Sequence, residues 1–177
     1  MRSIKWLFLL VCVSCVREVR NVPEIERPSG HRTSHSTCFS PEGSCDKKLI
    51  QFIRSAEKSL DIAVFDITHP QIVHEIVVAS RKAKVRMIVD QVQAIGVHSL
   101  VSTLERAGVD LRFGRQRGIM HHKFAIVDAA AVETGSFNYS MGATFKNREN
   151  QVYLTDPEVV REFQTNFDLM WKKSRDR

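Results

Sequence analysis

One histidine–lysine pair constrains this chain more than any other sequence feature. His121 and Lys123 stand two residues apart in the run from His121 to Asp128. If this run is a β-strand, successive side chains point to opposite faces, so these two emerge on the same face. An imidazole can act as nucleophile or proton carrier near neutral pH, and an ammonium group can neutralise the oxygens of a phosphate. The pair therefore suits phosphoryl transfer without a metal ion.

The residues that follow the pair extend the pattern. The run reads H-x-K-x4-D, and Gly135-Ser136-Phe137-Asn138 and then Glu149-Asn150 come after it. This pattern resembles the phospholipase D superfamily, and specifically its small single-motif members, the bacterial periplasmic endonucleases. The resemblance covers about residues 37–173, and it includes the segments 40–44, 132–138 and 146–150.

The resemblance implies a role for each polar residue of the pattern. His121 is expected to attack phosphorus and form a covalent phosphohistidine, while Lys123 binds the phosphoryl oxygens. Glu149 is expected to hydrogen-bond the far ring nitrogen of His121 and to fix its tautomer. Ser136 and Asn138 precede an expected short helix, whose backbone amides would complete a phosphate cradle. The family chemistry needs no metal or other cofactor, and no carboxylate or His/Cys cluster in the sequence recommends one.

Three polar residues near the motif have a structural interpretation. Asp128 belongs to the motif and is counted with the catalytic set, but its strand parity is opposite to that of His121, which favours a role in holding the strand end. Asn138 can also cap the short helix that is expected to begin near Tyr139. His122 faces away from the nucleophile and is expected to pack elsewhere.

The charge of the chain permits a polyanionic partner without demanding one. The formal charge is +6, but residues 1–35 hold six basic and three acidic side chains, which leaves +3 for the rest. The basic residues around the motif are predicted to bind substrate along a groove, and simple surface charge is the alternative for some of them. These residues are Arg112, Arg115, Arg117, Lys146 and Arg148.

The N-terminal segment predicts export to the periplasm or out of the cell. Residues 1–5 carry two positive charges, and the apolar run from Trp6 to Val16 is shorter than the roughly 20 residues of a membrane span. Lipidation of Cys15 and an uncleaved N-terminal membrane anchor are the alternatives. The predicted organisation is a signal peptide at 1–16, a polar linker at 17–36 and one catalytic domain at 37–177.

Two cysteines follow the linker. In an exported protein Cys38 and Cys45 favour a disulfide, with two free thiols as the alternative. A zinc site that adds His31 and His35 can be drawn, but the spacing fits no common zinc pattern. The sequence therefore predicts no metal site here.

Hydrophobic periodicity predicts one α/β domain, because apolar stretches of strand length alternate with helical patterns. A helix is expected to start at Ser40-Pro41-Glu42. The expected fold is a phospholipase D-like α/β sandwich with a mixed central sheet flanked by helices on both faces. Strands are expected at 60–65, 84–89, 109–113, 121–128, 131–134 and 149–154, and helices at 70–82, 97–107 and 157–172.

The combined pattern predicts a metal-independent phosphodiesterase. The first interpretation is a non-specific endonuclease that cleaves DNA, with RNA as a further candidate substrate. The alternative enzyme is a phospholipase D or cardiolipin hydrolase acting on phospholipid head groups, and a non-catalytic nucleic-acid-binding module is the third interpretation. A lipid enzyme should offer an apolar entry to its site, whereas residues 112–119 are mostly polar and basic, which favours nucleic acid.

The sequence also predicts a homodimer. None of the other histidines has a lysine two residues on, and a double displacement needs a second acid/base to protonate the leaving oxygen. A two-fold axis would supply His121 of the partner subunit in the same cleft. Membrane contact is expected only if the leader is retained or lipidated.

Overall fold

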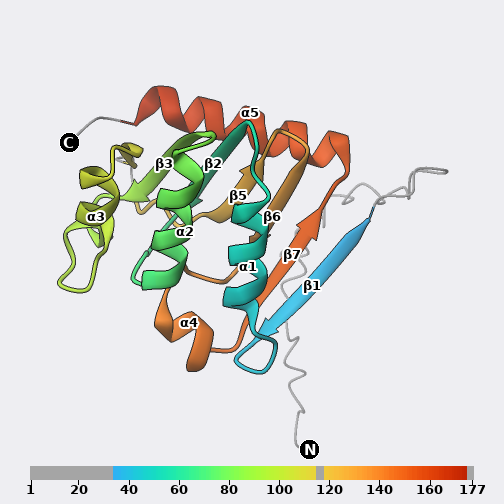
Figure 1. Ribbon diagram of the computed structural model, residues 1–177, viewed down its shortest axis with the longest axis horizontal. Coiled ribbons are helices and arrows are strands. Elements are labelled where there is room, and N and C mark those ends of the chain that lie inside the picture. The colour runs from blue at the N-terminus through green and yellow to red at the C-terminus, as the bar shows by residue number, and fades with distance from the viewer. Residues whose placement is uncertain (1–33, 115–117, 175–177) are drawn as a thin grey trace, which may run out of the picture. The chain divides into compact units, whose positions relative to one another are not determined.

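In the computed structural model, which describes residues 34–114 and 118–174, seven strands form one mixed sheet (Figure 1). Their spatial order is β1-β7-β6-β5-β2-β3-β4; β2, β3 and β4 run parallel, and all other neighbouring pairs are antiparallel. The predicted signal peptide and most of the predicted linker lie outside the described residues. The strands are β1 His35–Ser40, β2 Ser59–Val64, β3 Lys84–Asp90, β4 Asp110–Gly114, β5 Lys123–Val127, β6 Ala131–Gly135 and β7 Glu149–Leu154.

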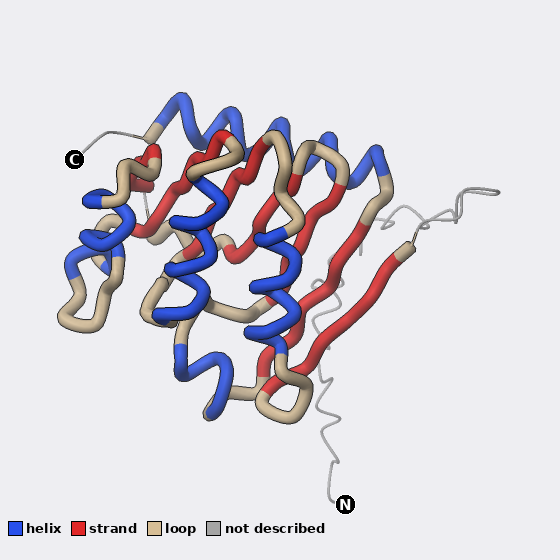
Figure 2. Tube along the Cα trace, in the orientation of Figure 1, coloured by secondary structure: helices blue, strands red, loops and turns tan. Residues whose placement is uncertain are grey.

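Helices cover both faces of this sheet (Figure 2). They are α1 Cys45–Arg54, α2 Pro70–Ser80, α3 Val101–Arg106, α4 Met141–Phe145 and α5 Pro157–Lys173, with a 3-10 turn η1 at Gln93–Ile95. In Figure 1, α1 and α2 lie side by side on one face, and α5 crosses the other. The predicted fold class is therefore confirmed. Among the described residues, no helix has the length and apolar character needed to cross a membrane.

The sheet separates two hydrophobic cores, and β5 shows how one strand serves both. Ala125 and Val127 pack into the core under α1 and α2, whereas Phe124 and Ile126 pack into the core under α5. All five residues of β5 are buried, because a strand that is covered on both faces has no solvent side. The predicted catalytic motif thus adjoins a strand that is buried along its whole length.

The N-terminal part of the fold differs from the prediction. The strand β1 was not predicted, and α1 begins at Cys45 after Ser44, so the helix start predicted at Ser40 is wrong. Ser40 instead pairs with Glu149 at the end of the antiparallel β1–β7 ladder. This edge strand is mostly polar and exposed, so its sequence lacks the apolar alternation of a half-buried strand. Because β1 begins at His35, the linker also ends earlier than predicted.

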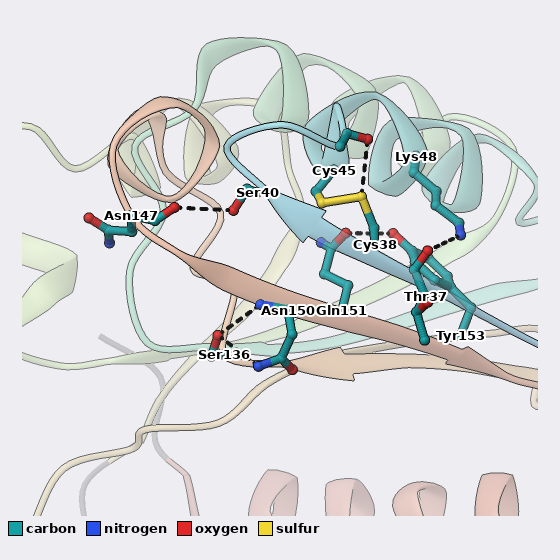
Figure 3. The surroundings of a disulfide bond; sticks show 11 residues. Thr37, Cys38, Ser40, Cys45, Lys48, Ser136, Asn147, Asn150, Gln151 and Tyr153 are labelled. Atoms are coloured by element: carbon teal, nitrogen blue, oxygen red, sulfur yellow. Dashed lines mark hydrogen bonds between the residues drawn. A yellow bond between two sulfur atoms is a disulfide. The ribbon is translucent and has the colours of Figure 1, made fainter.

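A disulfide joins Cys38 of β1 to Cys45 at the start of α1 (Figure 3). It ties the edge strand to the first helix, and it leaves neither sulfur as a thiolate for zinc. Within residues 34–114 and 118–174, no group of three or more His, Cys, Asp or Glu residues is arranged to hold a metal ion.

A carboxyl group is buried between the sheet and the GS-x-N segment. Glu133 on β6 has no exposed surface, and Tyr139 donates a hydrogen bond of 3.1 Å to its Oε2. Burial raises the pKa of Glu133 to about 8, against the opposing effect of the Tyr139 hydroxyl. The folded protein therefore holds a proton on Glu133 at neutral pH.

This proton makes stability depend on pH. The side chain releases its proton near pH 4.5 in the unfolded chain and near pH 8 in the folded one, so the folded state binds more protons between these values. Stability should therefore fall as pH rises through this window. Glu133→Gln should flatten this slope and be more stable than the unmodified protein at alkaline pH, by a few kcal/mol. Urea denaturation at about pH 5, 7 and 9 measures the effect; parallel pH profiles for the two proteins would contradict it.

Candidate active site

Except for Asp128, the residues predicted to be catalytic lie at one end of the sheet. β5 and β7 begin at this end, whereas β2 and β6 end there, so the residues before β5, after β6 and at the start of β7 come together. In Figure 1 this is the end of the sheet that carries α4. Lys123 is the first residue of β5, Glu149 is the first residue of β7, and Ser136 directly follows β6.

Lys123 is a nearly buried cation. Only 7% of the residue is exposed, and its Nζ donates a hydrogen bond of 2.8 Å to the backbone oxygen of His121. Burial lowers the pKa of Lys123, while the negative charges of Glu149 and Asp66 oppose that effect. An ammonium group has three donors, and one of them is used within the described residues. The other two are available to an anion.

His121 is exposed and lies just before β5, so the strand is two residues shorter at this end than predicted. The backbone oxygen of His122 still accepts a hydrogen bond of 2.9 Å from Phe65, which continues the β2–β5 pairing. The ring of Phe65 meets the His121 ring edge-on, with 4.7 Å between the centroids, and it also lies 5.2 Å from Lys123 Nζ. Phe65 therefore supports both halves of the motif.

His122 points to the other side of the sheet. Its ring contacts Phe124 edge-on, at 5.6 Å between centroids. Burial lowers the pKa of His122, and the positive charges of Lys123 and His121 lower it further. His122 remains exposed, and it contacts Phe124 rather than the residues around Lys123.

Glu149 is held by two side-chain donors. Ser136 Oγ donates to Oε2 at 2.5 Å, and Asn147 Nδ2 donates to Oε1 at 2.9 Å. Among the described residues, His121 donates no hydrogen bond to this carboxylate. In this structure Glu149 therefore orients Ser136 and Asn147, and its charge acts on Lys123.

A close approach to β7 fixes the GS-x-N segment. A side chain at Gly135 would place its Cβ 2.1 Å from the backbone oxygen of Asn150, so only glycine fits. The Ser136 N–H donates to that same oxygen at 3.1 Å, and the Asn150 N–H donates to Ser136 Oγ at 3.1 Å (Figure 3). Phe137 and Tyr139 are fully buried, so the alternate residues Ser136 and Asn138 face the site.

The same segment is clamped to the connection between β2 and α2. The backbone N–H of Tyr139 donates to the backbone oxygen of Asp66 at 3.1 Å. The backbone oxygen of Tyr139 accepts from the N–H groups of Thr68 and His69 at 3.0 Å each. Asn138 is thereby placed beside Asp66. α4 begins only at Met141 and is capped by Ser140, which accepts a hydrogen bond from Ala143. The alternative role of Asn138 as helix cap is therefore wrong.

Asp128 lies at the opposite end of β5 from His121. Its carboxylate accepts hydrogen bonds from the backbone N–H groups of Glu57, Lys58 and Ser59, the closest at 2.7 Å. Burial acts to raise the pKa of Asp128, but these three donors outweigh it and hold the pKa below its usual value. Asp128 thus joins the turn after β5 to the start of β2.

Replacing Asp128 should reduce stability rather than chemistry. Asp128→Asn keeps a residue that tolerates the positive φ of this turn but loses the charge that the three N–H groups share. We expect a loss of about 1–3 kcal/mol in the free energy of unfolding at neutral pH, with near-normal activity at temperatures where the variant is folded. Denaturant unfolding alongside Asp110→Asn, an exposed aspartate at the start of β4, provides the matched comparison. Normal stability with lost activity would instead place Asp128 in the chemistry.

The predicted substrate-binding arginines and lysine do not form one groove within the described residues. Arg112 donates a hydrogen bond of 2.8 Å to the backbone oxygen of Trp171 and stacks on its ring, so it fastens α5 to the sheet. Arg148 is exposed and lies 3.9 Å from Glu42. Lys146 is exposed at the end of α4. The remaining two, Arg115 and Arg117, lie outside the described residues.

Sequence reasoning missed Asp66 and Phe65. Asp66 is half-buried; burial raises its pKa, while the Ile67 N–H and the charge of Lys123 act in the opposite direction. Together with Asn138 it lines a pocket of about 740 Å³. A polar residue directly after the mostly apolar segment 60–65 could have indicated it, because such positions lie at the end of a strand. The contact of Phe65 with His121 depends on the β2–β5 pairing, which the sequence does not specify.

Comparisons with known proteins agree with this geometry. The family model described as cardiolipin synthase, PLD-like domain, matches residues 49–171. A mitochondrial cardiolipin hydrolase of Chlamydomonas reinhardtii is 34% identical over 146 residues, which cover 82% of this chain and 65% of that protein. The mitochondrial cardiolipin hydrolase of Homo sapiens is 32% identical over 172 residues, which cover 94% of this chain and 66% of that protein. This chain thus spans slightly less than two thirds of the length of these relatives.

A solved structure is similar as well. The crystal structure of a phospholipase D family member, Nuc from Salmonella typhimurium, has a TM-score of 0.77 and 31% identity, and the match covers 82% of this chain and 98% of that chain. This chain is therefore similar to a solved protein in both fold and sequence. The resemblance noted from the motif is confirmed.

The predicted periplasmic or secreted location is wrong. The cardiolipin hydrolases to which this chain is similar are mitochondrial proteins, which contradicts export. The error has a physical cause: a short basic segment followed by eleven apolar residues, Trp6 to Val16, has the same charge and hydropathy whether it directs export or serves another membrane-directed purpose.

Proposed function

The chain belongs to the phospholipase D-like family, and on that premise we propose that it is a metal-independent phosphodiesterase that hydrolyses the head-group phosphodiester of a cardiolipin-type phospholipid. The reaction is supported by one observation above all, the buried Lys123 ammonium group that is bound to the backbone of the exposed His121. Lys123 neutralises the non-bridging oxygens while His121 attacks phosphorus. The phosphohistidine that forms releases the alcohol and is then hydrolysed by water.

The proposed mechanism needs a proton donor for the leaving oxygen. The chain holds one H-x-K motif, so the donor comes from His121 of the partner subunit in a two-fold dimer. The same imidazole then accepts a proton from the attacking water. The exposure of His121 supports this arrangement, because an exposed ring can be reached by a second subunit.

Apolar side chains near the site favour a lipid substrate. Val97 and Met141 line the same pocket as Asp66 and Asn138, and Val97 is 92% exposed. Neighbouring large apolar side chains are exposed too, namely Val92 and Ile95 around η1 and Phe145 on α4. Exposed apolar side chains of this kind fit the apolar entry expected of a lipid enzyme. The names of the curated relatives support the same substrate and a location at a mitochondrial membrane.

Nucleic acid is the second candidate substrate. It is favoured by the solved relative Nuc and by the exposed Lys146 and Arg148 at the end of α4. The engagement of Arg112 with α5 weighs against it, because this arginine was expected to follow a nucleic-acid backbone. A non-catalytic binding module is disfavoured by the intact set of His121, Lys123 and Glu149.

The purified full-length protein should hydrolyse cardiolipin in vesicles in the presence of excess chelator. His121→Ala should abolish turnover, and Lys123→Ala should reduce it by about 10²–10³-fold, because an electrostatic donor to the transition state is lost. A labelled substrate should leave an acid-labile, base-stable adduct on His121. His74→Ala, an exposed histidine on α2, is the matched control and should retain activity.

The same assay compares substrates. Plasmid DNA and single-stranded RNA should be cleaved more slowly than vesicle lipid, and the opposite order would favour the second candidate. Activity that is lost in chelator and rescued by a divalent ion would contradict covalent catalysis by His121.

The shared-site mechanism requires a dimer. Light scattering of the full-length protein should give twice the mass of one chain at working concentration. Specific activity should fall on dilution into the range where the dimer dissociates, because each site then loses its proton donor. Full activity of a monomer would contradict this mechanism while leaving the role of Lys123 intact.

A further inference from the structure

The disulfide lies near the start of β7 (Figure 3), and we propose that it is a reversible switch: the enzyme is active with the bond closed and loses most of its activity when the bond is reduced. The bond joins Cys38 of β1 to Cys45, the first residue of α1. Cys38 stands two residues before Ser40, at the end of β1 that pairs with the start of β7. This inference rests on the proposed phosphodiesterase function, and it adds the regulation of the same site.

One strand pair and two hydrogen bonds lead from the disulfide to the site. Ser40 pairs with Glu149 in the β1–β7 ladder, and its Oγ donates a hydrogen bond of 3.5 Å to the backbone oxygen of Asn147. Asn147 Nδ2 in turn donates to Glu149 Oε1 at 2.9 Å. Figure 3 shows the contact between Ser40 and Asn147 beside the disulfide. A shift of this end of β1 therefore changes the support of the carboxylate whose charge acts on Lys123.

The position of Ser40 depends on this bond. In the described sheet β1 is an edge strand that pairs on one side with β7, and most of its residues are exposed. The loop after it is tightly folded, because a side chain at Gly43 would place its Cβ 2.4 Å from the backbone oxygen of Phe39. Ser44, just before α1, has a φ of 50°, which is unfavourable for a residue other than glycine. Opening the disulfide lets this loop relax, and Ser40 moves with it.

The structure also accommodates the reduced form. Cys38 Sγ lies 3.2 Å from the backbone oxygen of Gly43, so a thiol at Cys38 finds a hydrogen-bond acceptor already in place. Cys45 begins a helix of ten residues, and the positive end of the helix dipole stabilises negative charge on its departing sulfur. A stabilised leaving thiolate speeds thiol–disulfide exchange. The bond is therefore suited to open and to close again.

The reductant that this reaction needs is a dithiol, either a small molecule or a protein. Its first thiolate attacks the sulfur of Cys38, which is 7% exposed, whereas Cys45 is 1% exposed. The bond between the two cysteines breaks, and Cys45 leaves as a thiolate that takes up a proton. The second thiol of the reductant then displaces Cys38 in the same way. Two electrons and two protons pass to the protein, and the reductant becomes a disulfide.

The proposed location supports a bond that responds to redox conditions. Lasting disulfides are typical of exported proteins, whereas those found in reducing compartments of the cell are mostly transient or redox-sensing. The similar cardiolipin hydrolases are mitochondrial proteins, and a membrane inside the cell is the location proposed for this chain. At such a membrane the bond between Cys38 and Cys45 is expected to be a reversible cross-link.

Activity in the two redox states tests the switch. The full-length protein is incubated with oxidised or reduced dithiothreitol, and kcat is measured on cardiolipin vesicles in chelator. Reduction should lower kcat by about tenfold or more, because a displacement of about 1 Å within a site can cost about 10²-fold, and reoxidation should restore it. Cys45→Ala should show the low activity under both conditions. Joint replacement of Cys12→Ser and Cys15→Ser removes the other two cysteines, and this matched control should keep the full response.

A double-mutant cycle tests the route through Asn147. In the oxidised protein Asn147→Ala should lower kcat, and reduction should then have little further effect, because both changes remove the same support of Glu149. Ser36→Ala, an exposed residue of β1 far from Ser40, is the matched control and should leave the redox response unchanged. Fully additive effects of Asn147→Ala and reduction would overturn the coupling between the disulfide and Glu149.

Amide hydrogen exchange provides a measurement that does not depend on catalysis. Reduction should speed exchange in residues 147–151 and leave β5 unchanged. Equal kcat in the two redox states, or unchanged exchange at 147–151, would overturn the switch, and hydrolysis in both states would leave the proposed function standing. Faster exchange at 147–151 in a protein that hydrolyses no phosphodiester in either state would contradict the proposed function and leave the coupling intact.

Discussion

The structure of the site depends on one buried positive charge. The ammonium group of Lys123 is almost removed from water, and it is kept there by a hydrogen bond to the backbone of His121 and by the charges of Glu149 and Asp66. Burying an unpaired charge is costly, so these carboxylates are part of the fold as well as of the site. In return, a partly desolvated cation acts on a phosphate more strongly than a hydrated one. The same burial that costs stability thus provides the electrostatic stabilisation that the proposed reaction needs.

The rest of the fold holds the groups around this charge in place. Buried residues of β5 pack against both cores, and Asp128 anchors its far end to the backbone before β2. At the near end, two backbone clamps fix the GS-x-N segment, one to Asn150 on β7 and one to the residues after β2. The hydrogen bonds of Asp128 therefore stabilise the far end of β5, while His121 before its near end stays exposed.

The sequence predicted those elements whose apolar residues recur with a regular period. The bounds of α2, β3 and β7 and the single central sheet follow from apolar periodicity and turn residues. The strand β1 could not be predicted, because it is a polar edge strand that pairs with β7, more than a hundred residues away. The grouping of His121, Lys123, Ser136 and Glu149 was expected from the motif and its resemblance. The presence of Asp66 was not, because it depends on β2 being the neighbour of β5.

The balance of charge around Lys123 also bears on how a phosphodiester enters. Two carboxylates surround one ammonium group, so an approaching phosphodiester meets negative charge as well as positive charge. Glu149 is fixed by its hydrogen bonds to Ser136 and Asn147, whereas the pKa of Asp66 is already raised by burial. A negative charge placed at Lys123 raises that pKa further, since like charges disfavour the ionised form. Phosphate binding at Lys123 and protonation of Asp66 therefore favour each other.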